Sequence, residues 1–340
     1  MIRVTFLGTA ASRPTVGRNV SGIALQREGD LMLFDCGEGT QRQMMRFATG
    51  FGVSDIFVTH LHADHFIGII GLLRTMTLQG RQELLNIFGP PRSGATLKEA
   101  AHLGVERIGF PLGIRELEPG EVVPFGEYEV AAFPVDHPTP ALGYALKEHP
   151  RLGRFDVEQA RALGVPEGPL FGRLHRGEAV QVGGRLVRPE EVVGAPRPGR
   201  LVAYSGDTRP CLGTLEAARG ADLLIHESTF GEDDADRAYE TFHSTARGAA
   251  LLAKEAGVSR LILTHISARY AENPGPLVAE ARQHFQGAKV AHDGMTLELG
   301  YRADEGLAHG SEGEGEGDGG GAGGSRGEVK SAEGRGASHG

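Results

Sequence analysis

The segment from His60 to His65, His-Leu-His-Ala-Asp-His, brings four side chains of the kind that bind metal ions together within six residues. It follows Ile56-Phe57-Val58, an apolar run typical of a buried strand. Residues two apart in an extended chain point to the same side, so the first two histidines can share one metal ion. The turn into the next helix would aim the aspartate and the last histidine at another. The alternative, a histidine cluster on the surface or at a helix end, would make the meeting of four such side chains a coincidence.

Two metal ions close together need more ligands than these four, because each zinc ion takes four or five. Three further candidates each follow a predicted strand, namely His137, Asp207 and His265. A lone histidine after a strand is more often a hydrogen-bonded structural residue, but the carboxyl ends of strands are where α/β sheets build their sites. Asp207 has two carboxylate oxygens and is therefore the natural ligand for both ions to share.

Strand-like apolar runs alternate with helical patterns along most of the chain, which predicts an α/β fold. The predicted strands cover residues 2–7, 22–26, 31–35, 55–59, 85–88, 128–134, 201–204, 222–227 and 260–264. The predicted helices cover residues 40–47, 66–78, 96–103, 244–256 and 276–285.

Two segments interrupt this rhythm. Residues 151–200, here called the arm, are rich in glycine, proline and arginine but keep short apolar pairs, which predicts a partly ordered insertion. The arm holds nine arginines against six acidic residues, although the whole chain has a formal net charge of −9. Such a local basic excess favours contact with a phosphate backbone. Residues 304–340 are acidic and contain almost nothing that could be buried, so we expect this tail to be disordered.

No apolar run approaches the length of a membrane-spanning helix, and the first residues are apolar over too short a stretch for a signal peptide. The only two cysteines, Cys36 and Cys211, are interpreted as small reduced core residues rather than as a disulfide. These features predict a cytoplasmic protein without a membrane partner.

The ordered set of motifs resembles the metallo-β-lactamase superfamily and, within it, the transfer RNA 3′-processing endonucleases called ribonuclease Z. Besides the histidine segment, residues 34–41 (Phe-Asp-Cys-Gly-Glu-Gly-Thr-Gln) look like the family's first motif, and residues 226–230 and 243–245 match later ones. The arm carries runs similar to the flexible arm by which this family grips tRNA. The resemblance implies a four-layer αβ/βα sandwich over residues 1–303 as the catalytic domain, with the arm inserted at about 151–200. It also implies a homodimer in which one subunit's arm holds the RNA that the other cleaves.

The resemblance further assigns roles to individual residues. Two zinc ions per subunit are expected, one bound by His60, His62, His137 and Asp207, and the other by Asp64, His65, His265 and Asp207. Asp35 would orient metal ligands through hydrogen bonds without touching the metal. The candidate contacts to RNA are Arg18, Asn19, Gly168, Pro169, Arg173 and Arg176.

The expected reaction is removal of the 3′ trailer from precursor tRNA. Two zinc ions, two aspartates and a bridging hydroxide leave about one positive formal charge, which would attract a phosphodiester. In this hypothesis the metal-bridging hydroxide attacks phosphorus in line and Asp64 accepts its proton. His243, oriented by Glu227, then protonates the leaving 3′ oxygen. The products would be tRNA with a 3′-hydroxyl and a trailer with a 5′-phosphate. Alternatively, His243 and Glu227 serve only at a helix end, or Glu227 pairs with an arginine.

Two other functions fit parts of the pattern. The histidine segment alone does not separate a ribonuclease Z from another phosphodiesterase or a thioesterase of the same fold. From a different class, the chain could be a non-catalytic RNA-binding protein that uses zinc only for folding, although such structural sites are closed and often rich in cysteine. One position departs from the ribonuclease Z pattern, because Val16 stands where the family's loop near the cleavage site commonly has lysine. The treatment of substrates that already carry CCA is therefore not predicted.

Overall fold

Two seven-stranded sheets form the centre of the computed structural model, which describes residues 1–104 and 107–301. The first has the order β16-β1-β2-β3-β4-β5-β6 and the second the order β15-β14-β13-β12-β9-β8-β7. The strands of the first sheet are β1 (Ile2–Gly8), β2 (Gly22–Arg27), β3 (Asp30–Cys36), β4 (Val53–Phe57), β5 (Leu85–Gly89), β6 (Leu112–Glu116) and β16 (Thr296–Leu299). The strands of the second sheet are β7 (Val122–Pro124), β8 (Tyr128–Pro134), β9 (Leu142–Glu148), β12 (Leu201–Tyr204), β13 (Leu223–Glu227), β14 (Leu261–Thr264) and β15 (Lys289–Val290).

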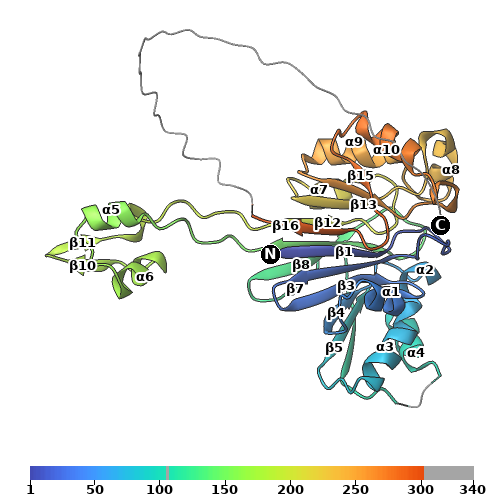
Figure 1. The fold of residues 1–340 in the computed structure, drawn as a ribbon, viewed down its shortest axis with the longest axis horizontal. Coiled ribbons are helices and arrows are strands. Elements are labelled where there is room, and N and C mark those ends of the chain that lie inside the picture. Colours follow the sequence, from blue (N-terminus) through green and yellow to red (C-terminus); the bar gives the residue numbers. More distant parts are fainter. Residues whose placement is uncertain (105–106, 302–340) are drawn as a thin grey trace, which may run out of the picture. The chain divides into compact units, whose positions relative to one another are not determined.

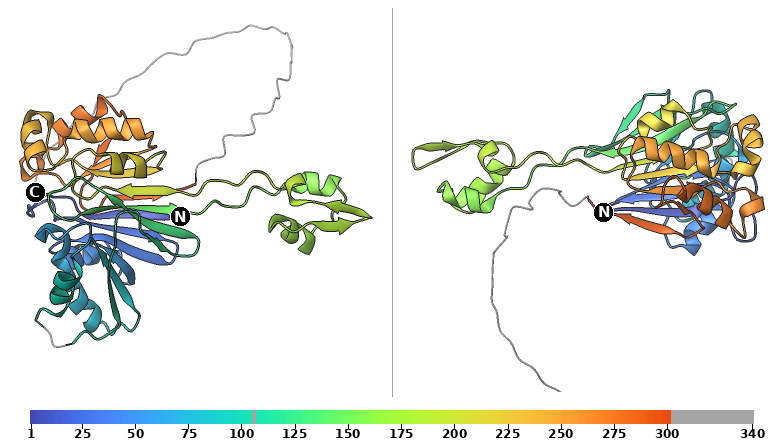
Figure 2. Two further views of the ribbon diagram at one scale, coloured as in Figure 1. Left: turned by 180° about the vertical axis from the view of Figure 1, so that it is seen from behind. Right: turned by 90° about the horizontal axis from the view of Figure 1, so that it is seen from above.

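Helices cover the outer face of each sheet (Figure 1, Figure 2). The first sheet is covered by α1 (Thr40–Arg46), α3 (Gly68–Leu78) and α4 (Gly94–His102), and the second by α7 (Leu212–Ala217), α9 (Ala246–Ala256) and α10 (Gly275–Arg282). One apolar cluster, which includes Phe57 and Tyr144, fills the space between the sheets. A second cluster lies between the second sheet and its helices, and a third lies between the first sheet and its helices. This arrangement confirms the predicted αβ/βα sandwich.

Helix α9 shows how the sequence builds an outer layer. The hydroxyl of Thr245, directly before the helix, accepts a hydrogen bond from the amide of Gly248 at 3.0 Å, which caps the first turn. Gly257 ends the helix with a left-handed φ of 66°, a conformation that glycine adopts at little cost. In between, small buried alanines face the second sheet, so the helix backbone can approach the strands closely.

The predicted strands all have counterparts, but several elements were missed. The run Leu-Gly-Tyr-Ala-Leu-Lys-Glu of β9 lies in the middle of the second sheet, although most of its residues favour helices. Burial on both faces outweighs that propensity, because only its penultimate residue is exposed. The predicted helix 66–78 is two helices, α2 (Ala63–Phe66) and α3. A further short helix, α8 (Ala235–Glu240), precedes α9.

The arm has an apolar cluster of its own. It contains α5 (Val157–Ala162), α6 (Pro169–His175) and the hairpin of β10 (Val180–Val182) and β11 (Arg185–Val187). Their buried side chains are Ala160, Val165, Leu174, Val180, Val187 and Val192. The two stretches that connect the arm to the sandwich pair with each other at Arg151 with Arg197 and at Phe155 with Val193.

The structure also bears on the predictions for the two cysteines and for membrane-spanning segments. Cys36 is buried and Cys211 only half-buried at the start of α7, and both are free thiols, so the interpretation of Cys211 as a core residue is wrong. None of the helices in the two described ranges has the length and apolar character needed to cross a membrane. The tail, residues 304–340, lies outside the described residues.

Candidate metal centre

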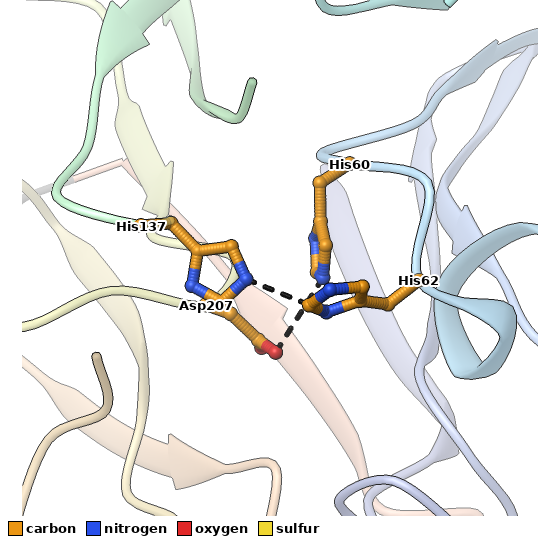
Figure 3. Close-up of side chains that lie close together, drawn as sticks. All are labelled: His60, His62, His137 and Asp207. Carbon is orange, nitrogen blue, oxygen red and sulfur yellow. Dashed lines mark hydrogen bonds and ion pairs between the residues drawn. The ribbon is translucent and has the colours of Figure 1, made fainter. Parts of the chain in front are cut away.

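The first group of candidate ligands comes together from three separate segments (Figure 3). His60 and His62 lie in the loop after β4, His137 follows β8, and Asp207 follows β12. Each of these four residues offers a ligand atom, and the four atoms all lie within 4.8 Å of one another. Their convergence is the geometry that a metal site requires, while their role as ligands stays a prediction.

The second group lies beside the first. Asp64, His65 and His265 also offer ligand atoms within 4.8 Å of one another. The Asp207 Oδ2 atom is 3.4 Å from His65 Nε2 and 3.3 Å from His265 Nε2, and it is 3.7 Å from His60 Nε2 of the first group. One carboxylate therefore lies between the two groups, as a ligand shared by two ions must.

The ring nitrogens of the candidate histidine ligands point in directions that suit bound cations. His65 Nδ1 lies 2.8 Å from the carboxylate of Asp35, and His265 Nδ1 lies 2.9 Å from the Thr229 hydroxyl. When each Nδ1 of a neutral imidazole donates to these partners, each Nε2 presents a lone pair, and the two Nε2 atoms are only 3.3 Å apart. Facing lone pairs repel unless a proton or a metal ion lies between them. In addition, His60 Nε2 is buried without a hydrogen-bond partner among the described residues.

The charges around the site also favour cations. Burial lowers the pKa of His60 well below its usual value and the pKa of His137 to about 4, so both rings are neutral at pH 7, as metal ligands must be. Burial raises the pKa of Asp207, but His265 and His65 outweigh it and hold that pKa well below the usual range. Burial alone would lower the pKa of His65, yet the carboxylates of Asp207 and Asp35 raise it well above its usual value. The ionised carboxylates thus attract a proton and, in its place, would attract a metal ion.

Asp35 orients two of the histidines. Its carboxylate accepts hydrogen bonds from the Thr59 amide at 2.7 Å, the Thr59 hydroxyl at 3.0 Å, the Tyr204 hydroxyl at 2.8 Å and His65 Nδ1 at 2.8 Å. The Thr59 hydroxyl is also 3.0 Å from His60 Nδ1. Asp35, the last residue but one of β3, has a left-handed φ of 58°, a conformation that non-glycine residues adopt infrequently. Asp35 was predicted from its motif, whereas Thr59 and Tyr204 were not, because their only signal in the sequence is their position at strand ends.

His243 and Glu227 form a pair at the same edge. His243 Nδ1 is 2.8 Å from Glu227 Oε1, and Glu227 is fully buried. Burial lowers the pKa of His243, but the charge and hydrogen bond of Glu227 outweigh it and raise this pKa to about 9. Glu227 also accepts hydrogen bonds from the backbone amides of Thr208, Thr229 and Ser244. The described partners of Glu227 are thus a histidine, backbone amides and the Thr229 hydroxyl rather than an arginine.

Thr229 connects this pair to the ligands, which the sequence analysis did not foresee. Its hydroxyl donates to Glu227 Oε2 at 2.9 Å and lies 2.9 Å from His265 Nδ1. His243 itself offers a nitrogen within 4.8 Å of ligand atoms on Asp207 and His265. The pair and the candidate metal ligands therefore form one continuous cluster.

The loop candidates for RNA contact lie differently from the expectation. Arg18 is buried, and its guanidinium donates to the Thr9 hydroxyl and to the carbonyl oxygens of Ala271 and Ala291. This geometry makes Arg18 a support of its loop and does not favour a direct contact with RNA. The Asn19 side chain donates to the Glu38 carbonyl oxygen at 2.8 Å.

The arm candidates are exposed. Gly168 has a φ of 126°, and Pro169 starts α6. Arg173 makes an ion pair with Glu178 at 2.8 Å, and Arg176 follows α6. Their contact with RNA stays a prediction.

Comparisons with known proteins agree with this geometry. Residues 31–155 and 188–266 match the family described as the beta-lactamase superfamily domain. The chain is 56% identical over 304 residues to ribonuclease Z of Myxococcus xanthus, which covers 89% of this chain and 99% of that protein. It is 52% identical over 305 residues to ribonuclease Z of Methanosarcina acetivorans, which covers 89% of this chain and 100% of that protein. The crystal structure of the short form of human tRNase Z superposes with a TM-score of 0.64 at 28% identity, over 88% of this chain and 99% of that one.

Proposed function

Because the chain belongs to the ribonuclease Z family, metal-dependent endoribonucleases of the metallo-β-lactamase fold that process tRNA 3′ ends, we propose that it removes the 3′ trailer of precursor tRNA in a zinc-dependent reaction. The cut would leave a 3′-hydroxyl on the tRNA and a 5′-phosphate on the trailer. The observation that carries the proposal is the meeting of two groups of candidate ligands around Asp207, with the His243–Glu227 pair beside them.

Two zinc ions per subunit are part of the proposal. The donor set supports zinc, since imidazole nitrogens and carboxylate oxygens are its usual ligands in catalytic sites. When bound, the ions would supply an activated water for attack on phosphorus and positive charge to stabilise the phosphoryl oxygens. The first ion would be held by His60, His62, His137 and Asp207, and the second by Asp64, His65, His265 and Asp207.

Asp64 is proposed to accept the proton of the attacking water. Its Oδ2 accepts a hydrogen bond from the backbone amide of Ser12 at 2.7 Å and lies 3.3 Å from His265 Nε2. Burial raises the pKa of Asp64, but its contacts with the nearby histidines His265 and His65 outweigh it, so the pKa is lowered and the carboxylate is ionised. An ionised carboxylate can take up a proton, but its lowered pKa makes it a weak base, so the position of Asp64 at the site supports this role rather than its basicity.

His243 is proposed to protonate the leaving 3′ oxygen. With its pKa raised to about 9, the ring carries two N–H groups at neutral pH. Nδ1 donates to Glu227, which leaves the proton on Nε2 for the leaving oxygen. Glu227 acts through His243, because its buried carboxylate orients the ring and stabilises its charge.

The arm is proposed to bind the tRNA, as an insertion at 151–200 in a catalytic domain of residues 1–303, with residues 304–340 as a separate tail. Two observations support the insertion. The arm has its own apolar cluster, and the matched family leaves out residues 156–187, which lie inside the arm.

A homodimer and a cytoplasmic location complete the proposal. The ribonuclease Z resemblance implies that the arm of one subunit holds RNA for the other. Mixing a His243→Ala variant with a variant defective in the arm would restore cleavage only in a dimer that works across subunits. The location is supported by the tRNA substrate and by the free thiols of Cys36 and Cys211.

The direct test is incubation of purified protein with a 3′-extended precursor tRNA, with and without a chelator, followed by mapping of the cut and of both new ends. We expect chelator-sensitive cleavage that leaves the predicted ends. Turnover of only a small phosphodiester or a thioester would favour the other enzymes of this fold. Tight binding of the RNA without cleavage in zinc-supplied protein would favour a non-catalytic binding protein.

A further inference from the structure

The arm leaves the sandwich from two neighbouring strands of the second sheet. β9 ends at Glu148, and β12 begins directly after Arg200. The strands run antiparallel with Lys147 opposite Leu201, and the Glu148 amide donates to the Arg200 carbonyl oxygen at 2.9 Å. The arm is therefore the long connection of one hairpin, and this residue pair is its root.

A buried ionic cluster lies at this root. Arg200 donates through Nε and Nη2 to both oxygens of Glu148, at 2.8 and 2.6 Å. Arg27, at the end of β2 in the first sheet, donates to the same carboxylate at 2.8 Å. Glu148, Arg200 and Arg27 are 3%, 1% and 6% exposed, so solvent screens their interaction little. We call these three residues the root cluster.

The root cluster contacts both the other sheet and the arm. Arg200 Nη1 donates to the Leu299 carbonyl oxygen in β16 at 2.6 Å. The ring of Tyr301 lies 4.0 Å from the guanidinium of Arg200 and 3.2 Å from that of Arg151, the first residue of the arm. A side chain at Gly199 would collide with the Glu148 carbonyl oxygen, so the two chains approach closely here. The start and end of the arm are thus tied to both sheets.

Buried ion pairs are a poor means of adding stability, because removing charges from water costs much of what their attraction provides. Such pairs instead restrict geometry, because a bidentate arginine–carboxylate pair accepts few relative orientations. Burial raises the pKa of Glu148, but hydrogen bonds from Arg200 and Arg27 lower it to about 2, so the carboxylate stays charged at any physiological pH. The root cluster is therefore better suited to fixing directions than to adding stability.

The same two strands also lead to the candidate metal centre. At the start of β9, the Leu142 amide donates to the Thr59 carbonyl oxygen, next to His60. At the other end of β12, only six residues separate Arg200 from Asp207. The arm root and the shared metal ligand are thus opposite ends of one short, hydrogen-bonded strand pair.

We propose that Glu148, held by Arg27 and Arg200, is a positioning residue that sets the root of the arm relative to the metal centre and so determines how tightly precursor tRNA is held. The inference rests on the proposed function, because it takes the arm to be the tRNA-binding element. Glu148 itself touches neither the substrate nor the reacting atoms.

The test is steady-state kinetics of full-length Glu148→Gln with a 3′-extended precursor tRNA and with a small chromogenic phosphodiester. The amide keeps the shape of the side chain and removes the charge that both arginines share. We expect KM for the precursor to rise at least tenfold, with kcat and the rate on the small phosphodiester within twofold of wild type. Glu148→Asp keeps a carboxylate, and its KM for the precursor should lie between the values of wild type and Glu148→Gln.

Glu298→Gln is the matched control. Glu298 pairs with Arg3 at 2.8 Å between β16 and β1, but both side chains are about half exposed, and we expect unchanged values for both substrates. If Glu148→Gln does not fold, Tyr301→Leu removes the ring between Arg151 and Arg200 without leaving a buried charge. This variant should raise KM for the precursor at least threefold and spare the small substrate.

Two results would overturn the inference: an unaltered KM for the precursor in a folded variant, or equal losses on both substrates, which would mark the root cluster as merely structural. Failure of the proposed function looks different. Wild-type protein would then hydrolyse the small phosphodiester but leave precursor tRNA intact, and the inference would fall with it.

Discussion

The metal centre and the arm use charged side chains in opposite ways. In the centre, four of the seven candidate ligands are buried, and the ligands come from distant segments. His65 and His265 each have a ring nitrogen held by a specific partner, Asp35 and Thr229 respectively. In the arm, Arg161, Arg173 and Arg185 are exposed and pair with acidic residues at most six positions away.

This difference determines how large an effect a substitution has in each region. A buried group deprived of its partner has no water to replace it, so its loss is large. An exposed pair contributes about 0 to 1 kcal/mol, because water and salt already screen it. Changes in the centre should therefore affect every substrate, whereas changes in the arm should affect only a substrate large enough to reach it.

The largest effect is expected from removal of metal. Dialysis against a chelator should lower cleavage of precursor tRNA and of a small phosphodiester together by about a thousandfold or more, because both need the same activated water. Measured rates should return when zinc is added back. Retention of either activity in metal-free protein, verified by elemental analysis, would separate the reaction from this site.

Replacing His243 should have the next largest effect. His243→Ala is expected to lower kcat on precursor tRNA by about a hundredfold to ten-thousandfold, the usual contribution of a general acid. Zinc content, measured by elemental analysis, should stay the same. Because His243 also has a nitrogen near Asp207 and His265, loss of zinc in this variant would show that it acts as a ligand instead.

The third prediction concerns stability at the root of the arm. The pKa of Glu148 is lowered from 4.5 to about 2 in the folded chain, so its stabilising contribution is complete above pH 4.5 and is lost as the pH falls toward 2. Urea unfolding at a series of pH values should show this loss in the wild type. Glu148→Gln leaves the two buried guanidinium groups without their carboxylate and should be about 3 kcal/mol less stable than the wild type at neutral pH, with a smaller difference near pH 2. If the free energies of unfolding of wild type and Glu148→Gln changed with pH in parallel, the prediction would be wrong.

The smallest effects are expected in the arm itself. Arg176→Ala should weaken precursor binding a few-fold and lower the salt dependence of log Kd by about one unit, as for one lost phosphate contact. Arg173→Ala should change less, because Arg173 already pairs with Glu178. Filter binding across salt concentrations distinguishes the two. A large loss of activity on the small phosphodiester in either variant would show that the arm and the centre do not act separately.

The residues that meet in the candidate metal centre could be named from sequence because the expected chemistry is carried by residue identity. Histidines and aspartates directly after strands are few, and the strands that carry them were recognisable from apolar runs. The supporting residues were not, because threonine and tyrosine are common at strand ends. Nothing in the sequence distinguishes the Tyr204 hydroxyl that reaches Asp35 from any other tyrosine.

Burial was the second limit of sequence reasoning. Arg18 was named as a candidate RNA contact, and nothing in the sequence indicates that its guanidinium is buried and donates to the carbonyl oxygens of Ala271 and Ala291. β9 was missed because the fold, rather than local propensity, makes it a strand. In the arm, composition indicated an insertion, but the apolar cluster that gives it internal order arises from single apolar residues spread over about thirty positions.

The hydroxyl of Thr229 has a consequence for how the reaction can be dissected. It joins His265 on one side to Glu227 and His243 on the other, so the candidate ligand and the proposed acid are not independent parts. Energies of substitutions within such a network do not add. The effect of removing His243 will depend on which residue stands at 265, and only double-mutant cycles can divide the rate enhancement between the two.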